Sequence, residues 1–249
     1  MKLNLPALVA VMALVCTLSA CGGGGDSGST APPYSSAPHP VAKSVLIDAQ
    51  GDSTMKGSEQ RADGTYFYAP SSAPAVLQAL LQSAYGSTVT VQNHGVGGST
   101  VADVLNGVAG YTQPWKDALP ANTAQVVIAN WAINDSNPIV NETPAQFEAD
   151  LLYWIQITQA AGKTVVLEEP NPVCNPAFDA LPQYVQVVDN IAAQLAIPLV
   201  KQYDYIQSLP NWQSYLGTDC THPADDRLYQ IKAERELAVV QPIVASLAR

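Results

Sequence analysis

The chain has 249 residues, of which 21 are acidic and 11 are basic, and its formal net charge is −10 at pH 7. This acidic balance argues against nucleic acid as a partner and against electrostatic docking on anionic lipid, because both carry negative charge. The four cysteines show neither Cys-x-x-Cys spacing nor a Cys/His cluster, which argues against a zinc site.

Residues 1–20 have the layout of a secretory signal. Lys2 supplies one positive charge, and a mainly apolar stretch with small residues near its end leads to Cys21. The run Leu18-Ser19-Ala20-Cys21 resembles the lipobox of bacterial lipoproteins, which implies cleavage before Cys21 and attachment of lipid chains to it. The alternatives are an ordinary secretory signal and an uncleaved membrane helix. We therefore expect a bacterial envelope protein, anchored by lipid or exported.

Residues 21–40 are predicted to form a flexible tether, because four glycines follow Cys21 and a Ser/Pro-rich run continues to Pro40. Gly22 stands where an aspartate would resemble the inner-membrane retention signal, which favours the outer membrane if the host is Gram-negative. Residues 41–249 are long enough for one large α/β domain.

Short apolar runs rich in Val and Ile predict five strands in the region after the tether. In chain order they are Ser44–Asp48, Val89–Gln92, Gln125–Ala129, Thr164–Glu168 and Pro198–Val200.

Longer segments with helical periodicity lie between and after these runs. The clearest begins where Thr143 can cap a helix, Pro144 suits its first turn and Gln146 completes a capping box. Pro242 is expected to kink or end the last helix. The predicted helices are Ala75–Ala84, Thr143–Ala161, Gln183–Leu195 and Ala224 to about Val240.

Alternating strands and helices predict an α/β fold, a three-layer αβα sandwich with a mainly parallel five-stranded sheet. Ligands of such sheets bind at the carboxyl ends of the strands. Polar motifs should therefore follow the strands, and four segments fit this rule: Gly51-Asp52-Ser53, Asn93–Thr100, Ala132–Asp135 and Asp219–His222.

These four blocks, in this order, resemble those of the SGNH hydrolases, also called the GDSL esterase/lipase family. The resemblance extends from Val45 to about Ile231 and implies the flavodoxin-like fold of that family. It implies that Ser53 is a nucleophile, that His222 is its general base and that Asp219 orients the imidazole. By the same resemblance the oxyanion hole consists of the backbone N–H groups of Ser53 and Gly98 and the side-chain amide of Asn134.

The expected activity is that of a serine esterase without a cofactor. Its substrates would be small-molecule or glycan esters: short-chain acyl or acetyl esters, with carbohydrate as one carrier, or lysophospholipids. Two alternatives stay open, an O-acyltransferase acting on envelope glycans and a non-catalytic envelope binding lipoprotein with the same fold.

Two cysteines remain once Cys16 is removed with the signal and Cys21 carries lipid. We expect Cys174 and Cys220 to form a disulfide in an oxidising compartment, and two buried free thiols are the alternative.

Three further features lead to expectations about single residues. Ala132 stands where the family usually has glycine, which would add a methyl group near the acyl pocket and either narrow it or shift the turn. His94 is expected to satisfy a loop carbonyl more readily than to line the crevice. Glu168 and Glu169 are expected to form a solvated strand end, because adjacent strand residues point to opposite faces.

Overall fold

The structure is a computed structural model, and it describes residues 43–249. The predicted signal, the tether and the lipid attachment at Cys21 lie outside the described residues. Among residues 43–249, no helix combines the length and apolar character that crossing a membrane would require.

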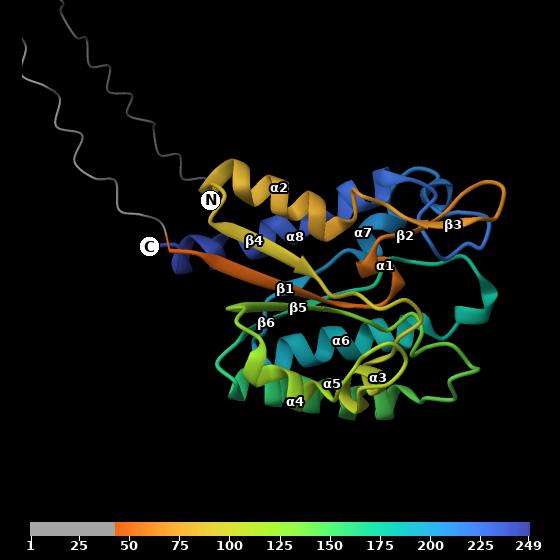
Figure 1. Cartoon of the computed structure of the whole chain (residues 1–249). Coiled ribbons are helices and arrows are strands. Elements are labelled where there is room, and N and C mark those ends of the chain that lie inside the picture. Colours follow the sequence, from red (N-terminus) through yellow and green to blue (C-terminus); the bar gives the residue numbers. More distant parts are fainter. Residues whose placement is uncertain (1–42) are drawn as a thin grey trace, which may run out of the picture. The chain divides into compact units, whose positions relative to one another are not determined.

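A five-stranded, fully parallel sheet forms the middle layer, as the sequence predicts (Figure 1). Its strands lie in the order β4-β1-β5-β6-β7, which is the flavodoxin-like order when only the strands of this sheet are counted. Such an order places a ligand site beside the first strand, where the chain changes direction across the sheet. The strands are β1 (Val45–Gly51), β4 (Val89–Asn93), β5 (Val126–Asn130), β6 (Thr164–Glu168) and β7 (Leu199–Val200).

Helices cover both faces of this sheet, so the strands are buried on two sides. Helices α2 (Ala73–Tyr85) and α8 (Asp226–Leu247) pack on one face, and α3 (Val101–Asn106), α4 (Trp115–Ala118), α5 (Pro144–Ala160) and α6 (Leu181–Leu195) lie on the other (Figure 1). The remaining helical segments are short: α1 (Ser53–Lys56), α7 (Tyr203–Gln207), η1 (Leu119–Ala121), η2 (Pro176–Phe178) and η3 (Trp212–Tyr215).

The helix ends test two of the sequence expectations. The capping box of α5 is present, because Thr143 and Gln146 each accept the backbone N–H of the other. Of the two outcomes expected for Pro242, a kink or the end of the helix, the second is wrong, since α8 continues to Leu247 with Pro242 inside it. Val240 and Val244 are fully buried on either side of the proline, and their packing offsets its missing hydrogen bond.

A small antiparallel hairpin, which the sequence analysis does not predict, stands at the end of the sheet toward which β1 and β4 point (Figure 1). It consists of β2 (Ser58–Gln60) and β3 (Tyr66–Tyr68). Gly64 closes its turn at φ +82°, a conformation that favours glycine. The hairpin supplies side chains to the site described next.

Candidate active site

Ser53 directly follows Asp52 at the end of strand β1, as the first residue of the four-residue helix α1. Asp52 caps this helix by accepting the Thr54 N–H at 2.8 Å. Gly51 is required immediately before, because a Cβ there would collide with the carbonyl oxygen of Asn130 on the neighbouring strand. The tight strand-to-helix turn therefore holds the Ser53 hydroxyl at the carboxyl end of the sheet.

The structure brings Ser53, His222 and Asp219 into one hydrogen-bonded chain. His222 Nε2 lies 2.8 Å from Ser53 Oγ, and His222 Nδ1 lies 2.6 Å from Asp219 Oδ2. The second carboxylate oxygen of Asp219 accepts the backbone N–H groups of Thr221 and His222, each at 3.0 Å. Burial opposes ionisation of Asp219, but the hydrogen bonds from the His222 ring and the two backbone groups outweigh it and lower its pKa to about 2.

Side chains of the β2–β3 hairpin also position Asp219. The sequence analysis does not predict this contribution. The Tyr66 hydroxyl donates to Asp219 Oδ2 at 3.0 Å, and Gln60 Nε2 donates to the Tyr66 hydroxyl at 3.1 Å. Gln60 Oε1 accepts the Asp219 backbone N–H. A signal for this element exists in the sequence, since an Asp63-Gly64 pair before Tyr66-Phe67-Tyr68 is typical of a hairpin turn.

Tyr66→Phe is expected to lower kcat about three- to tenfold with little change in KM, because it removes one hydrogen bond that orients Asp219. Steady-state kinetics with p-nitrophenyl acetate measure the effect. Tyr153→Phe is the matched control, since Tyr153 is 47% exposed on α5, does not line the catalytic cavity, and its hydroxyl makes no hydrogen bond within residues 43–249. Equal kcat values for the two variants would show that the Tyr66 hydroxyl does not help to orient Asp219.

Three donors face the same space as the Ser53 hydroxyl. Among residues 43–249, the backbone N–H groups of Ser53 and Gly98 have no acceptor. Gly98 adopts φ +79°, in the region that favours glycine. Asn134 Nδ2 donates one hydrogen to the Ser99 carbonyl oxygen at 3.0 Å, which orients the amide and leaves its second hydrogen free. The arrangement provides the donors that an oxyanion requires.

These groups line one cavity of about 390 Å³. Ser53, Gly98, Asn134 and His222 all contribute to its wall, with Asp219 behind His222. The site residues predicted from the sequence lie in distant segments of the chain, and the fold brings them together at this cavity. The other lining residues are Ser58, Tyr66, Phe67, Tyr68 and Gly97.

Ala132 does not line this cavity, which corrects the expectation of an added methyl group near the acyl pocket. Its side chain is fully buried in the core on the α5 side of the sheet. Its backbone has φ +113°, a conformation that glycine adopts more easily. The Ala132 N–H donates to the buried Asp135 carboxylate at 3.0 Å, which holds the turn that presents Asn134.

Glu168 and Glu169 are not a solvated strand end: they are 1% and 2% exposed. The expectation is wrong because distant groups supply partners for both side chains. Glu168 lies 3.4 Å from the ammonium of Lys232, which is itself fully buried on α8. Glu169 accepts the backbone N–H groups of Gln202 and Tyr203 at 2.7 and 2.8 Å.

His94 neither satisfies a loop carbonyl with its side chain nor lines the catalytic cavity, so that expectation also changes. Its Nδ1 lies 2.7 Å from the carboxylate of Asp48, a buried residue of β1. The hydrogen bond to Asp48 raises the pKa of His94 although partial burial opposes it. His94 belongs to a second cavity.

A disulfide joins Cys174 to Cys220, as expected from the sequence. Cys220 lies between Asp219 and His222, and its carbonyl oxygen accepts the Cys174 N–H at 2.9 Å. The bond therefore ties the loop that carries two triad residues to the segment after β6.

Cys174→Ser/Cys220→Ser is expected to lower the free energy of unfolding by about 2–4 kcal/mol and Tm by about 5–15 °C, because the bond closes a long loop. We also expect a lower kcat, since the Asp219–His222 loop loses its tether. Thermal unfolding and steady-state kinetics of the variant, compared with the oxidised chain, measure both effects. Unchanged Tm and kcat would show that the loop is positioned without the disulfide.

Ser53, His222 and Asp219 at the carboxyl edge of the parallel sheet form the arrangement of side chains that serine hydrolases use. A family model described as GDSL-like Lipase/Acylhydrolase matches residues 49–226. The chain belongs to this family and is a carboxylic ester hydrolase.

Solved structures with the same fold include three relevant enzymes. The lipase/acylhydrolase from Enterococcus faecalis is 19% identical over 82% of this chain and 97% of its own, with a TM-score of 0.65. The acetylxylan esterase from Geobacillus stearothermophilus is 20% identical over 80% and 95%, with a TM-score of 0.63. The aryl esterase from M. smegmatis is 15% identical over 82% and 100%, with a TM-score of 0.59. No curated protein sequence matches the chain.

Proposed function

We propose that this enzyme is a serine esterase that hydrolyses short-chain acyl esters, acetyl esters foremost, through an acyl-enzyme on Ser53. The observation that carries the proposal is the unbroken chain from Ser53 Oγ through His222 to Asp219, beside three oxyanion donors in one cavity. No cofactor takes part in this chemistry.

The reaction proceeds in two halves. His222 takes the Ser53 proton as the hydroxyl attacks the ester carbonyl, and the Ser53, Gly98 and Asn134 N–H groups stabilise the oxyanion. Collapse of the tetrahedral intermediate expels the alcohol, which receives the proton from His222. Water, activated by the same histidine, then attacks the acyl-enzyme and releases the acid.

Activity is expected to fall in acid with the uptake of one proton, because protonated His222 cannot accept the Ser53 proton. Asp219 stays ionised across this limb, since its pKa is held at about 2. The logarithm of kcat/KM should therefore fall with a slope of one on the acid limb of the profile. A slope of two would mean that a second group protonates with His222.

The dimensions of the cavity support a short acyl group. Its volume is about 390 Å³, and its apolar wall comes from the aromatic residues of β3. The acetylxylan esterase and the aryl esterase are similar in fold, which is consistent with an ester of this size. Lysophospholipids would need room for a long chain.

A chain-length series of p-nitrophenyl esters tests the acyl preference. We expect kcat/KM to be highest for acetate and to fall steadily through butyrate, hexanoate and octanoate. A maximum at octanoate would contradict the short-chain proposal and favour a lipid substrate. Product analysis with and without an added sugar acceptor distinguishes hydrolysis from O-acyl transfer, and we expect free acid in both cases.

The cellular location is a separate proposal that rests on the sequence alone. The lipobox-like run before Cys21 and the Gly/Ser/Pro-rich residues 21–40 support an enzyme anchored by lipid in the bacterial envelope. Labelling of the expressed chain with a radioactive fatty acid, with Cys21→Ser as the control, tests it. Equal labelling of both proteins would contradict the anchor.

A further inference from the structure

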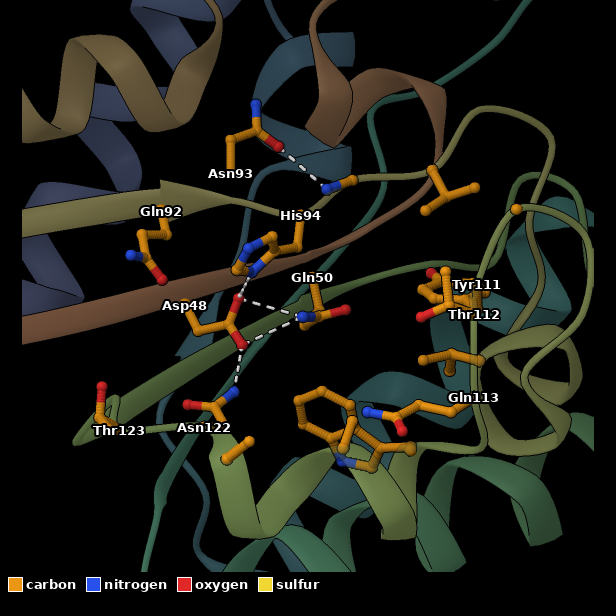
Figure 2. A pocket seen from close by; sticks show the side chains of 17 residues that line it. Asp48, Gln50, Gln92, Asn93, His94, Tyr111, Thr112, Gln113, Asn122 and Thr123 are labelled. Carbon is orange, nitrogen blue, oxygen red and sulfur yellow. Dashed lines mark hydrogen bonds and ion pairs between the residues drawn. The ribbon is translucent and has the colours of Figure 1, made fainter.

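A second, larger cavity of about 730 Å³ lies on the other side of the loop that carries Gly98. His94, Gly95 and Val96 line this cavity, whereas Gly97 and Gly98 line the catalytic one. Its remaining wall comes from β1, the end of β4, the segment 110–113, α4 and the residues around Asn122 (Figure 2). A volume of this size fits a small-molecule ligand.

The inner wall of this cavity is a buried polar cluster centred on Asp48, which is 1% exposed. The Asp48 carboxylate lies 2.7 Å from His94 Nδ1 and accepts hydrogen bonds from Gln50 Nε2 and Asn122 Nδ2 (Figure 2). Each carboxylate oxygen therefore has two polar partners. A buried carboxylate with this many partners is a built feature and not an accident of the surface.

Gln50 is the member of the cluster that lacks a partner. Its side chain is 4% exposed, and its amide nitrogen is held by both oxygens of Asp48 at 3.0 Å, which fixes the orientation of the amide. The amide oxygen is buried and has no donor within residues 43–249. In Figure 2 this oxygen points away from Asp48, toward the side of the cavity where Tyr111 and Thr112 lie. A buried acceptor without a donor is unfavourable, so the cavity offers a place for a ligand that donates a hydrogen bond.

The other groups that line the cavity indicate which chemical class of ligand it would bind. Besides Gln50, the amides without a partner within residues 43–249 are those of Gln92 and Gln113, and hydroxyls come from Tyr111, Thr112 and Thr123. The amides of Asn93 and Asn122 also line the cavity but are hydrogen-bonded to the protein. No Lys or Arg occurs among the described residues that line the cavity, and its one carboxylate is paired with His94. Such a lining suits a neutral molecule with many hydroxyl groups, since amides both donate and accept hydrogen bonds.

Contacts between side chains link the wall of this cavity to the oxyanion donors. The Tyr111 hydroxyl lies 3.3 Å from Ser99 Oγ, and the Ser99 carbonyl accepts the hydrogen bond that orients the Asn134 amide. The loop 94–98 forms a wall of both cavities. A ligand in the second cavity would therefore lie against the segment that carries the oxyanion donors.

We propose that this second cavity is a subsite for a neutral sugar residue in the alcohol half of the ester substrate. The proposal rests on the esterase function above, and it names the substrate class as an acylated neutral glycan. The acyl group would enter the Ser53 cavity while a sugar unit of the same chain binds beside Gln50.

Gln92→Ala/Gln113→Ala tests the subsite, because both residues are exposed and their amides make no hydrogen bond within residues 43–249. Gln156→Ala/Gln159→Ala is the matched control, since these amides are exposed on α5 and do not line the cavity. Calorimetric titration of the full chain with xylotriose, cellotriose, maltotriose and acidic trigalacturonate measures binding without turnover.

We expect at least one neutral trisaccharide to bind, with a Kd about tenfold higher in Gln92→Ala/Gln113→Ala and unchanged in the control. The KM for the acetylated form of that trisaccharide should rise in parallel, while p-nitrophenyl acetate turnover stays equal in all three proteins. No binding of a neutral sugar, equal Kd values in both variants, or preferential binding of trigalacturonate would overturn the subsite. Failure of the esterase itself would be seen separately, as the absence of p-nitrophenyl acetate turnover in the unaltered chain.

Discussion

Replacing Ser53 with alanine is expected to lower kcat/KM for p-nitrophenyl acetate by at least about 10⁴-fold. The reason is that the Ser53 hydroxyl is the one oxygen placed 2.8 Å from His222 Nε2 in the catalytic cavity described above. Without it no acyl-enzyme forms, and His222 can at best activate water. The oxyanion donors remain in place, so a small residual rate above the uncatalysed reaction is expected.

Ser83→Ala is the matched control for this substitution, because Ser83 is an exposed residue of α2 far from the site in the fold. Its kcat/KM should equal that of the unaltered chain. Thermal unfolding of both variants establishes that they fold. If Ser53→Ala and Ser83→Ala hydrolyse the ester at equal rates, Ser53 is not the nucleophile.

Asp219→Asn is expected to lower kcat by about 10⁴-fold with a smaller change in KM. Asparagine keeps the size and one acceptor oxygen, so the loop should fold. However, the amide nitrogen of asparagine can donate a hydrogen bond to His222 Nδ1, whereas the carboxylate can only accept one. The proton of the neutral imidazole then lies on Nε2, and this tautomer cannot take the Ser53 proton. The loss of negative charge also removes the stabilisation of the imidazolium that forms during attack.

Asp204→Asn provides the comparison, since Asp204 is an exposed aspartate of α7 without a side-chain hydrogen bond within residues 43–249. Single-turnover and steady-state rates of the two variants separate catalysis from binding. A loss of less than about tenfold in Asp219→Asn would mean that Tyr66 or another group can orient His222 without the carboxylate.

The sheet and the catalytic groups could be predicted because they depend on local patterns. Each strand of the sheet is a short apolar run, and the first three polar blocks begin within a few residues of the ends of β1, β4 and β5. The fourth block follows β7 at a greater distance along the chain. In a parallel sheet the carboxyl ends of strands meet at one edge, so Ser53, Asn134 and His222 could be expected together before any distance was known.

The missed features depend on pairs that are distant in the sequence. Burial of Glu168 requires the ammonium of Lys232, and the position of His94 depends on Asp48, 46 residues earlier. Neither partner carries a local signal, because a charged residue in an amphipathic pattern is usually solvated. The role of Tyr66 was missed for a different reason, since the strands of its hairpin have only three residues each.

The central claim is that Ser53 carries the acyl group during turnover. Rapid acid quenching of the enzyme mixed with p-nitrophenyl acetate, followed by peptide mass spectrometry, tests it most directly. We predict a pre-steady-state burst of p-nitrophenol and one acetylated peptide, the one that contains Ser53, with neither seen in Ser53→Ala. Turnover without an acetylated Ser53 peptide, or an acetyl group on another residue that forms and decays at the catalytic rate, would contradict the account.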